Sequence, residues 1–106
     1  MNLNLRILAV FCLAASISSP VFAQGGADTY KAKCVICHDA DGLGSTSVGK
    51  SLKIVSFKDP AVVKSSNAAL ETIIKNGKNK MPAFGSSLSD AQIVAVVEYI
   101  RTLEKK

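Results

Sequence analysis

The apolar positions near the end of the chain recur at helical spacing and predict a terminal helix. Ser89 and Gln92 are three residues apart, as in a capping box, and they mark where this helix begins. The apolar residues after them are three or four positions apart: Ile93, Val96, Val97, Ile100 and Leu103. β-branched residues are also common in strands, but the cap and the length of the pattern favour a helix.

Shorter patterns predict three earlier helices. In the first, over about residues 27–36, Gly26, Tyr30 and Cys34 recur every four residues and share one face. A short helix over 60–63 can open at its proline. The next is expected over about 67–76, and it has N-cap candidates, apolar positions and a terminating glycine: Ser65, Ser66, Asn67, Leu70, Ile73, Ile74 and Gly77.

Two segments rich in turn-forming or helix-breaking residues are expected to be loops, 39–49 and 78–87. After the first of them comes a close run of apolar residues: Leu52, Ile54, Val55 and Phe57. This run could form a short strand, but we expect an irregular segment or a single helical turn. Since no convincing strand, internal repeat or second domain is visible, the sequence predicts one all-α domain.

The first 23 residues resemble a secretory signal peptide. Arg6 lies before an apolar run of 11 residues, 7–17, and Val21-Phe22-Ala23 offers a cleavage site. Because a membrane span needs roughly 20 apolar residues, we expect cleavage and export rather than stable membrane insertion. Removal of 23 of the 106 residues leaves 83, lowers the formal charge from +5 to +4, and leaves the mature domain, 24–106, with one histidine and one methionine.

The most specific motif is Cys34-Val35-Ile36-Cys37-His38, the attachment signature of a covalently bound haem. On a helical turn, two thiols at i and i+3 and an imidazole at i+4 share one face, so the thiols can reach a porphyrin edge while His38 faces the iron. A Cys34–Cys37 disulfide of the thioredoxin type would need neighbouring strands, and a zinc site needs about four ligands. Haem attachment is the best of these interpretations.

Met81 is the candidate for the second axial ligand. It lies 43 residues after His38, in Lys80-Met81-Pro82-Ala83-Phe84, and the proline keeps it out of a helix. A lone methionine is usually a core filler, but the exported chain contains no second histidine, and a lysine amine would have to lose its proton first. Pairing of methionine with histidine raises the reduction potential of a haem.

Together these residues resemble a small class I cytochrome c, the bacterial monohaem type, over essentially the whole mature segment. Besides the attachment motif, the resemblance rests on Gly77 with the methionine loop, on Gly26 and Tyr30 in the first helix, and on Tyr99 in the last. It implies a cytochrome c-like orthogonal bundle of three to five short helices around one haem c. It also implies thioether bonds at Cys34 and Cys37 and axial ligation by His38 and Met81.

The chain departs from the family in the loop after the motif, where members often have a proline whose carbonyl region accepts a hydrogen bond from the histidine. Here the loop reads Gly44-Ser45-Thr46-Ser47-Val48-Gly49. Some carbonyl of this loop is expected to orient His38. Apolar residues expected to pack around the haem are Val48, Leu52, Ile54, Phe57, Ile73, Ile74, Phe84 and Val96.

The expected function is that of a soluble periplasmic electron carrier, not an enzyme, whose iron cycles between ferrous and ferric states. The alternatives are a haem enzyme or gas-binding protein with a labile sixth ligand, and a haem subunit of a larger oxidoreductase. The expected partners are redox proteins with acidic docking surfaces, attracted by lysines near the haem edge: Lys50, Lys53, Lys78 and Lys80. Nucleic acid is not an expected partner, and the protein is expected to be a monomer.

Overall fold

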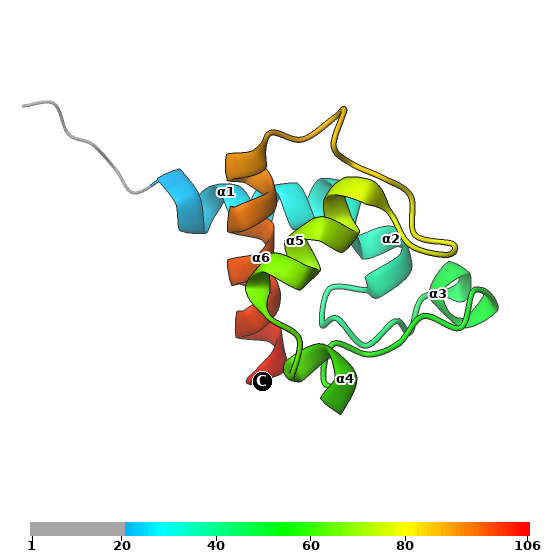
Figure 1. Ribbon diagram of the computed structural model, residues 1–106. Helices are drawn as coiled ribbons and strands as arrows, with labels where there is room; N and C mark the ends of the chain where they lie inside the picture. Colours follow the sequence, from blue (N-terminus) through cyan, green and yellow to red (C-terminus); the bar gives the residue numbers. More distant parts are fainter. Residues whose placement is uncertain (1–20) are drawn as a thin grey trace, which may run out of the picture.

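The computed structural model describes residues 21–106, and the regular elements of this part of the chain are all helices, joined by loops (Figure 1). Its helices are α1 (Val21–Lys33), α2 (Val35–His38), α3 (Ser47–Ser51), α4 (Pro60–Val63), α5 (Asn67–Asn76) and α6 (Asp90–Glu104). Within 21–106 the only β-type pairing is an isolated bridge between Lys78 and Met81. The predicted all-α fold is therefore confirmed, while most of the predicted signal peptide, 1–20, lies outside the described residues. None of the described helices is long and apolar enough to cross a bilayer.

The centre of the molecule is the crossing of α1 and α6 (Figure 1). Gly26 allows the close approach, because a Cβ at this position would overlap the carbonyl oxygen of Ala95. Beside it Tyr30 is 1% exposed, and its ring lies 5.2 Å from that of Tyr99. The expected contact between the first and last helices is thus confirmed.

We predict that Gly26→Val will destabilise the protein by about 1–3 kcal/mol, the usual cost of overpacking a well-packed contact. The matched control is Gly25→Ala, since a Cβ at Gly25 meets nothing within 4 Å and alanine is the better helix former. Chemical denaturation of both variants measures the difference. Equal stabilities for the two variants would show that the helices do not approach closely at Gly26.

The buried apolar residues form one cluster to which α1, α5, α6 and the loops around Phe57 and Leu88 contribute. Its members are Tyr30, Phe57, Ile74, Leu88, Ile93, Val96, Val97, Ile100 and Leu103. The Tyr30 hydroxyl donates a 2.6 Å hydrogen bond to the carbonyl oxygen of Asp39, and burial raises the pKa of this hydroxyl. This bond ties the core to the chain that leaves the cysteine motif.

Local signals explain where the later helices begin. Ser66 and Ser89 accept hydrogen bonds from the backbone N–H groups of Ala69 and Gln92. Gln92 Oε1 accepts a bond from the Ser89 N–H, which completes the predicted capping box. After α5, the expected terminating glycine, Gly77, has a positive φ of 78° with an extended ψ of 165°. The predicted helices over 60–63, 67–76 and the chain end are confirmed.

The connection between α4 and α5 is held against α6 by Arg101. Its guanidinium donates to the carbonyl oxygens of Val62 and Ser65 and to Oδ1 of Asn67, and it pairs with Glu104. Three backbone or side-chain acceptors from one segment suit the fixed fork of an arginine. These bonds from Arg101 fix the position of α4, whose Val62 lines the site described below.

Three predicted boundaries are wrong. The first helix begins at Val21, well before the predicted start near residue 27. The first helix does not continue to residue 36, because it is interrupted at Cys34 (φ −113°) and a new helix, α2, begins at Val35. The loop predicted over 39–49 ends early, because Thr46 accepts a 2.9 Å hydrogen bond from Gly49 N and starts α3. The apolar run after α3 is irregular, as preferred over a strand.

Candidate functional site

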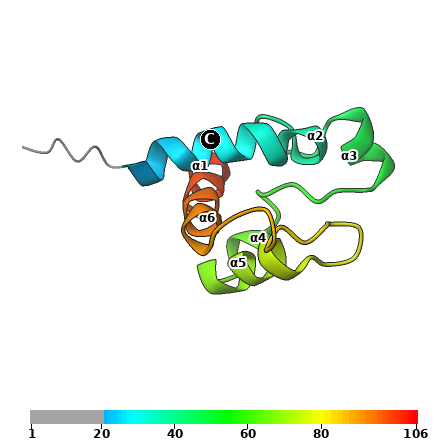
Figure 2. The same cartoon turned by 90° about the horizontal axis from the view of Figure 1, so that it is seen from above.

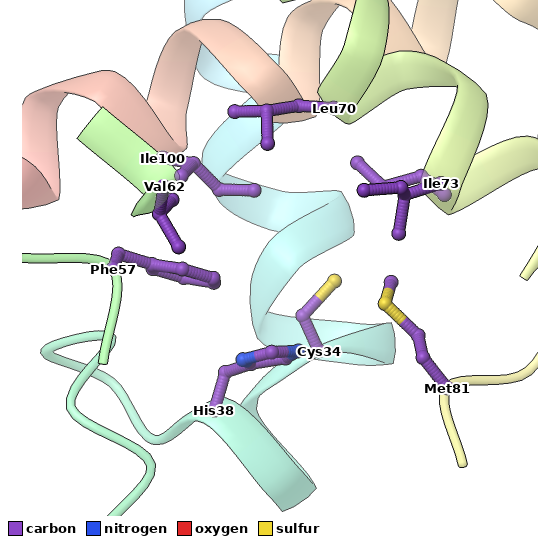
Figure 3. Close-up of a pocket in the computed structure, with 9 residues that line it drawn as sticks. Cys34, His38, Phe57, Val62, Leu70, Ile73, Met81 and Ile100 are labelled. Atoms are coloured by element: carbon purple, nitrogen blue, oxygen red, sulfur yellow. The ribbon is translucent and has the colours of Figure 1, made fainter. Parts of the chain in front are cut away.

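Cys34, His38 and Met81 face one another across an apolar hollow (Figure 3). α2 and α3 lie on one side of the molecule, and α5 with the loop after it lies on the other (Figure 2). Other residues that line this hollow are Phe57, Val62, Leu70, Ile73, Ile74 and Ile100. The fold therefore brings together three of the predicted site residues, although Met81 is far from the other two in sequence.

The His38 side chain rises from the last residue of α2 toward the hollow (Figure 3). Its ring stacks on that of Phe57, with centroids 4.7 Å apart and planes inclined by 23°. Burial lowers the pKa of the imidazole below its ordinary value, which favours the neutral ring with a lone pair free to bind iron. Its Nδ1 is buried and has no hydrogen-bond partner among the described residues, a state that costs about 1–3 kcal/mol for a polar group.

The two cysteines at this site are both free thiols. Cys34 lines the hollow below Leu70 and Ile73, and Cys37 lines a neighbouring hollow together with Cys34 and His38. Burial, helped by the nearby Cys37, raises the pKa of the Cys34 thiol to about 11. Residues 21–106 contain no cluster of three His, Cys, Asp or Glu side chains that could hold a metal ion, so the zinc alternative gains no support.

Met81 is held by a tight turn after α5. Lys78 N donates to Met81 O over 3.1 Å and Met81 N donates to Lys78 O over 2.9 Å, with Asn79 at a positive φ of 52°. A Cβ at Gly77 would lie 2.8 Å from Met81 O, so only glycine fits under this turn. The backbone is therefore fixed while the thioether points into the hollow (Figure 3).

The hydrogen bond expected between His38 Nδ1 and a carbonyl group of the loop after α2 is not formed in the described part of the chain. Only the end of that segment folds into α3 (Ser47–Ser51), where several carbonyl groups accept bonds from nearby backbone N–H groups. Lys50 N donates to Thr46 O, Leu52 N to Val48 O, and Lys53 N to Lys50 O; in addition, Ile54 N donates to Gly49 O. The carbonyl groups of Gly44 and Ser45, before α3, accept none of these bonds. The expectation that a carbonyl of this loop orients His38 therefore stays a prediction.

The lining was predicted in part. Leu52, Ile54, Phe57, Ile73, Ile74 and Phe84 line this hollow or the ones that adjoin it. Val48 was a wrong choice, because it is 41% exposed, and Val96 is fully buried in the helix core instead. Sequence reasoning missed Val62, Leu70 and Ile100 as lining residues. Leu70 and Ile100 were recognised as parts of apolar helix faces, but nothing in the sequence shows which part of a face is left for a ligand.

Exposed lysines surround the opening of the site. Lys53, Lys78 and Lys80 line an adjoining hollow of about 390 Å³, a volume typical of cofactor sites. Lys33, which was not predicted, lines another, whereas Lys50 is exposed but lines none of the hollows described here. Neither ion pair in the described part of the chain involves these lysines, so their charge is available to a partner.

This set of groups fits a flat, largely apolar ligand that contains a metal. An imidazole nitrogen and a thioether sulfur face the same space and can supply two axial ligands, the thiols lie at one side, and the remaining lining is mainly apolar. A haem needs such an arrangement, whereas a bare metal ion would need more donors close together. The residues present therefore fit the haem that the motif predicts.

Comparisons with known proteins agree with this site. Residues 22–100 match the family model described as cytochrome C oxidase, cbb3-type, subunit III. Cytochrome c6 of Synechococcus sp. is 35% identical over 92% of this chain and 88% of its own length. Cytochrome c6 of Euglena gracilis is 36% identical over 74% of this chain and 88% of its own. A solved structure, the KustC0563 c-type cytochrome, is similar with a TM-score of 0.68 and 27% identity, and the match covers 74% of this chain and 96% of that one.

Proposed function

The chain belongs to the small monohaem c-type cytochromes of class I, and on that premise we propose that His38 and Met81 hold the iron of its haem as axial ligands. It is an electron-transfer protein with one covalently bound haem c. We propose that Cys34 and Cys37 form the thioether bonds to this group. The observation that best supports these proposed ligands and attachment points is that His38 and Met81, 43 residues apart in sequence, line the same apolar hollow as Cys34.

The residues of the chain have simple tasks in this function. When bound, the haem supplies a one-electron change between ferrous and ferric iron. The apolar lining excludes water from the site, and the fixed turn at Met81 holds the thioether in one place, so that little has to rearrange when the charge changes. Asp, Glu and Arg side chains are absent from the lining of the hollow, as suits an electron carrier.

The test of the ligand set is a visible spectrum of the purified protein with a pyridine haemochrome assay. We expect covalent haem, low-spin iron and the weak far-red band of iron–sulfur ligation. Carbon monoxide added to the reduced protein should bind slowly or weakly. Rapid and tight binding would instead support a haem enzyme or gas-binding protein with a labile sixth ligand.

A second candidate is a haem subunit of a larger oxidoreductase. The description of the matching family model, a subunit of cbb3-type cytochrome c oxidase, favours it. The cytochrome c6 relatives, in contrast, are matched over most of their own length by this small chain. The size of the protein after mild extraction separates a free monomer, which we propose, from a bound subunit.

The chain is proposed to act in the periplasm, as a soluble protein. The proposal rests on the sequence of residues 1–23, read as a cleavable signal, with 24–106 as the mature cytochrome domain. The first three residues of α1 would then be removed with the signal. Mass spectrometry of the exported protein, with Gln24 as the expected N-terminus, tests both points.

The exposed lysines around the site are proposed to dock redox partners that carry an acidic surface. Like charges gathered at one opening attract an oppositely charged partner from a distance, and salt screens this attraction. The lysines that line the adjoining hollows are Lys33, Lys53, Lys78 and Lys80.

We predict that the double change Lys78→Glu and Lys80→Glu will slow electron transfer to the physiological partner about tenfold or more at low salt, since electrostatic steering contributes roughly 10- to 1000-fold to such rates. Stopped-flow kinetics over a salt series measures the effect, which should fade at high salt. The control, Lys105→Glu with Lys106→Glu, makes the same change in net charge at the end of α6. If both double variants slow transfer equally, net charge matters and a local docking surface does not.

A further inference from the structure

Asp39, the residue directly after His38, has a backbone conformation that is essentially restricted to glycine. Its φ is 66° and its ψ is 164°. Gly77, after α5, has nearly the same conformation, with a φ of 78° and a ψ of 165°. A side chain in this region clashes with its own backbone, so a residue other than glycine stays there only where its surroundings hold it. The chain is therefore strained at the point where it leaves the proposed iron ligand.

Hydrogen bonds hold Asp39 in this conformation. Its N–H donates a 2.9 Å bond to Val35 O, and its carboxylate accepts a 2.7 Å bond from Ala40 N. Its carbonyl oxygen accepts a 3.2 Å bond from Gly42 N and a 2.6 Å bond from the Tyr30 hydroxyl. The first three partners lie within four residues of Asp39 and belong to the same turn. Among these bonds, the one from Tyr30 ties the turn to a separate helix, α1.

Tyr30 is a firm anchor for this bond. It is 1% exposed, and its ring packs against the rings of Tyr99, 5.2 Å away, and Phe57, 6.2 Å away. Burial raises the pKa of its hydroxyl, so the group stays protonated and remains a donor. A buried ring with little room to move therefore fixes the position of the Asp39 carbonyl.

We propose that the Tyr30 hydroxyl is a positioning group for His38, because its bond to Asp39 O holds the strained turn between α2 and the loop that follows. The proposal rests on the proposed role of His38 as an axial ligand. The loop is joined to His38 directly, since Gly44 N donates a 2.9 Å bond to His38 O. Relaxation of Asp39 would move the loop relative to α2, and the imidazole would turn with respect to the haem. The bond acts through the backbone, so it is independent of any acceptor for the His38 Nδ1.

The experiment compares Tyr30→Phe with Tyr99→Phe in the holoprotein. Each change removes one hydroxyl from the same pair of rings, but only the first removes the bond to Asp39. We expect Tyr30→Phe to lower the folding equilibrium constant by about two- to tenfold, as for one lost hydrogen bond. It should also change the pattern of haem methyl shifts in the NMR spectrum of the oxidised protein, which depends on the orientation of the axial ligands.

Tyr99→Phe should keep the wild-type methyl pattern. The proposal is overturned if Tyr30→Phe keeps this pattern too, or if both variants change it equally. A loss of stability in Tyr30→Phe without a change of the pattern would show a structural role alone.

Two changes at Asp39 test whether the hydroxyl acts on a strained residue. Both glycine and alanine remove the carboxylate, but glycine adopts this conformation without strain and alanine does not. We expect Asp39→Ala to unfold at a lower denaturant concentration than Asp39→Gly, the reverse of the usual order where φ is negative. In the Asp39→Gly background, Tyr30→Phe should leave the methyl pattern nearly unchanged, because no strain drives the turn to relax. An equal change in both backgrounds, or an alanine variant at least as stable as the glycine variant, would refute the proposal.

The wild-type protein reports the ligand set separately. In the reduced protein, the Met81 methyl and the His38 ring protons should show the large ring-current shifts of groups bound on the haem axis. If these shifts are missing, the ligand set is wrong and the role of Tyr30 at His38 fails with it. If they are present and the methyl pattern does not respond to Tyr30→Phe, the ligand set stands and only the role of Tyr30 is wrong.

Discussion

Replacement of Met81 by alanine is expected to lower the reduction potential by on the order of 0.2 V, within the roughly 0.8 V range that axial ligands set. The reason is that a thioether donates weakly to ferric iron, so its pairing with histidine keeps the potential high. Met81 is the only methionine within residues 21–106, and no second histidine can take its place. The iron should become high-spin and bind carbon monoxide rapidly after reduction.

Leu70→Ala is the matched control for this change. Leu70 lines the same hollow as Met81, and its truncation also removes side-chain volume without touching a proposed ligand. The control should keep the low-spin spectrum and lose about 2–5 kcal/mol of stability at most. A Met81→Ala protein that remains low-spin, with an unchanged far-red band, would contradict axial ligation by the thioether.

The second large effect is expected from Cys34→Ser combined with Cys37→Ser, which removes both proposed attachment points. An 83-residue domain has a net stability of roughly 4–12 kcal/mol, and small chains bury only a marginal core. Without the haem, the hollow lined by Val62, Leu70 and Ile73 must fill with water or collapse. We expect the haem-free chain to be loosely ordered and to lose most of its cooperative unfolding.

The structure predicts which part of the molecule loses more order when the haem is absent. The core at the crossing of α1 and α6 is formed by protein side chains, among them Tyr30, Val96 and Leu103, which are at most 2% exposed. The turn at Met81 and the segment through α3 instead border the hollow. Amide hydrogen exchange of the double variant should therefore show lost protection first around α2, α3 and Met81, with residual protection in α6.

Circular dichroism and haem staining after denaturing electrophoresis check this prediction. Cys37→Ser alone is the control, because it leaves Cys34 as one attachment point and should retain some covalent haem. A double variant with native near-ultraviolet signals and a sharp unfolding transition would show that the fold does not depend on the cofactor. A double variant that still carries covalent haem would contradict the proposed thioether positions.

The sequence by itself determined the parts of this protein that depend on neighbours along the chain. Capping residues such as Ser89 and Gln92, the proline that opens α4 and the apolar periodicity of α6 act within one or two turns, so their spacing predicts the helices. The order of thiols, imidazole and thioether likewise gives the chemistry of the site, because each donor type prefers a known partner. The limits of this reasoning appear at Cys34 and Thr46, where a kink and a side-chain cap changed the predicted boundaries.

Only the tertiary structure decided how distant segments share one space. It brings Met81 across from His38, places Phe57 beside the imidazole, and leaves Val62, Leu70 and Ile100 to complete the lining. It also folds the end of the expected loop into α3 and leaves His38 Nδ1 without a hydrogen-bond partner in the described part of the chain. Such contacts depend on the packing of the whole chain against itself, because a side chain of a given type can face the core, the solvent or the ligand with the same local spacing.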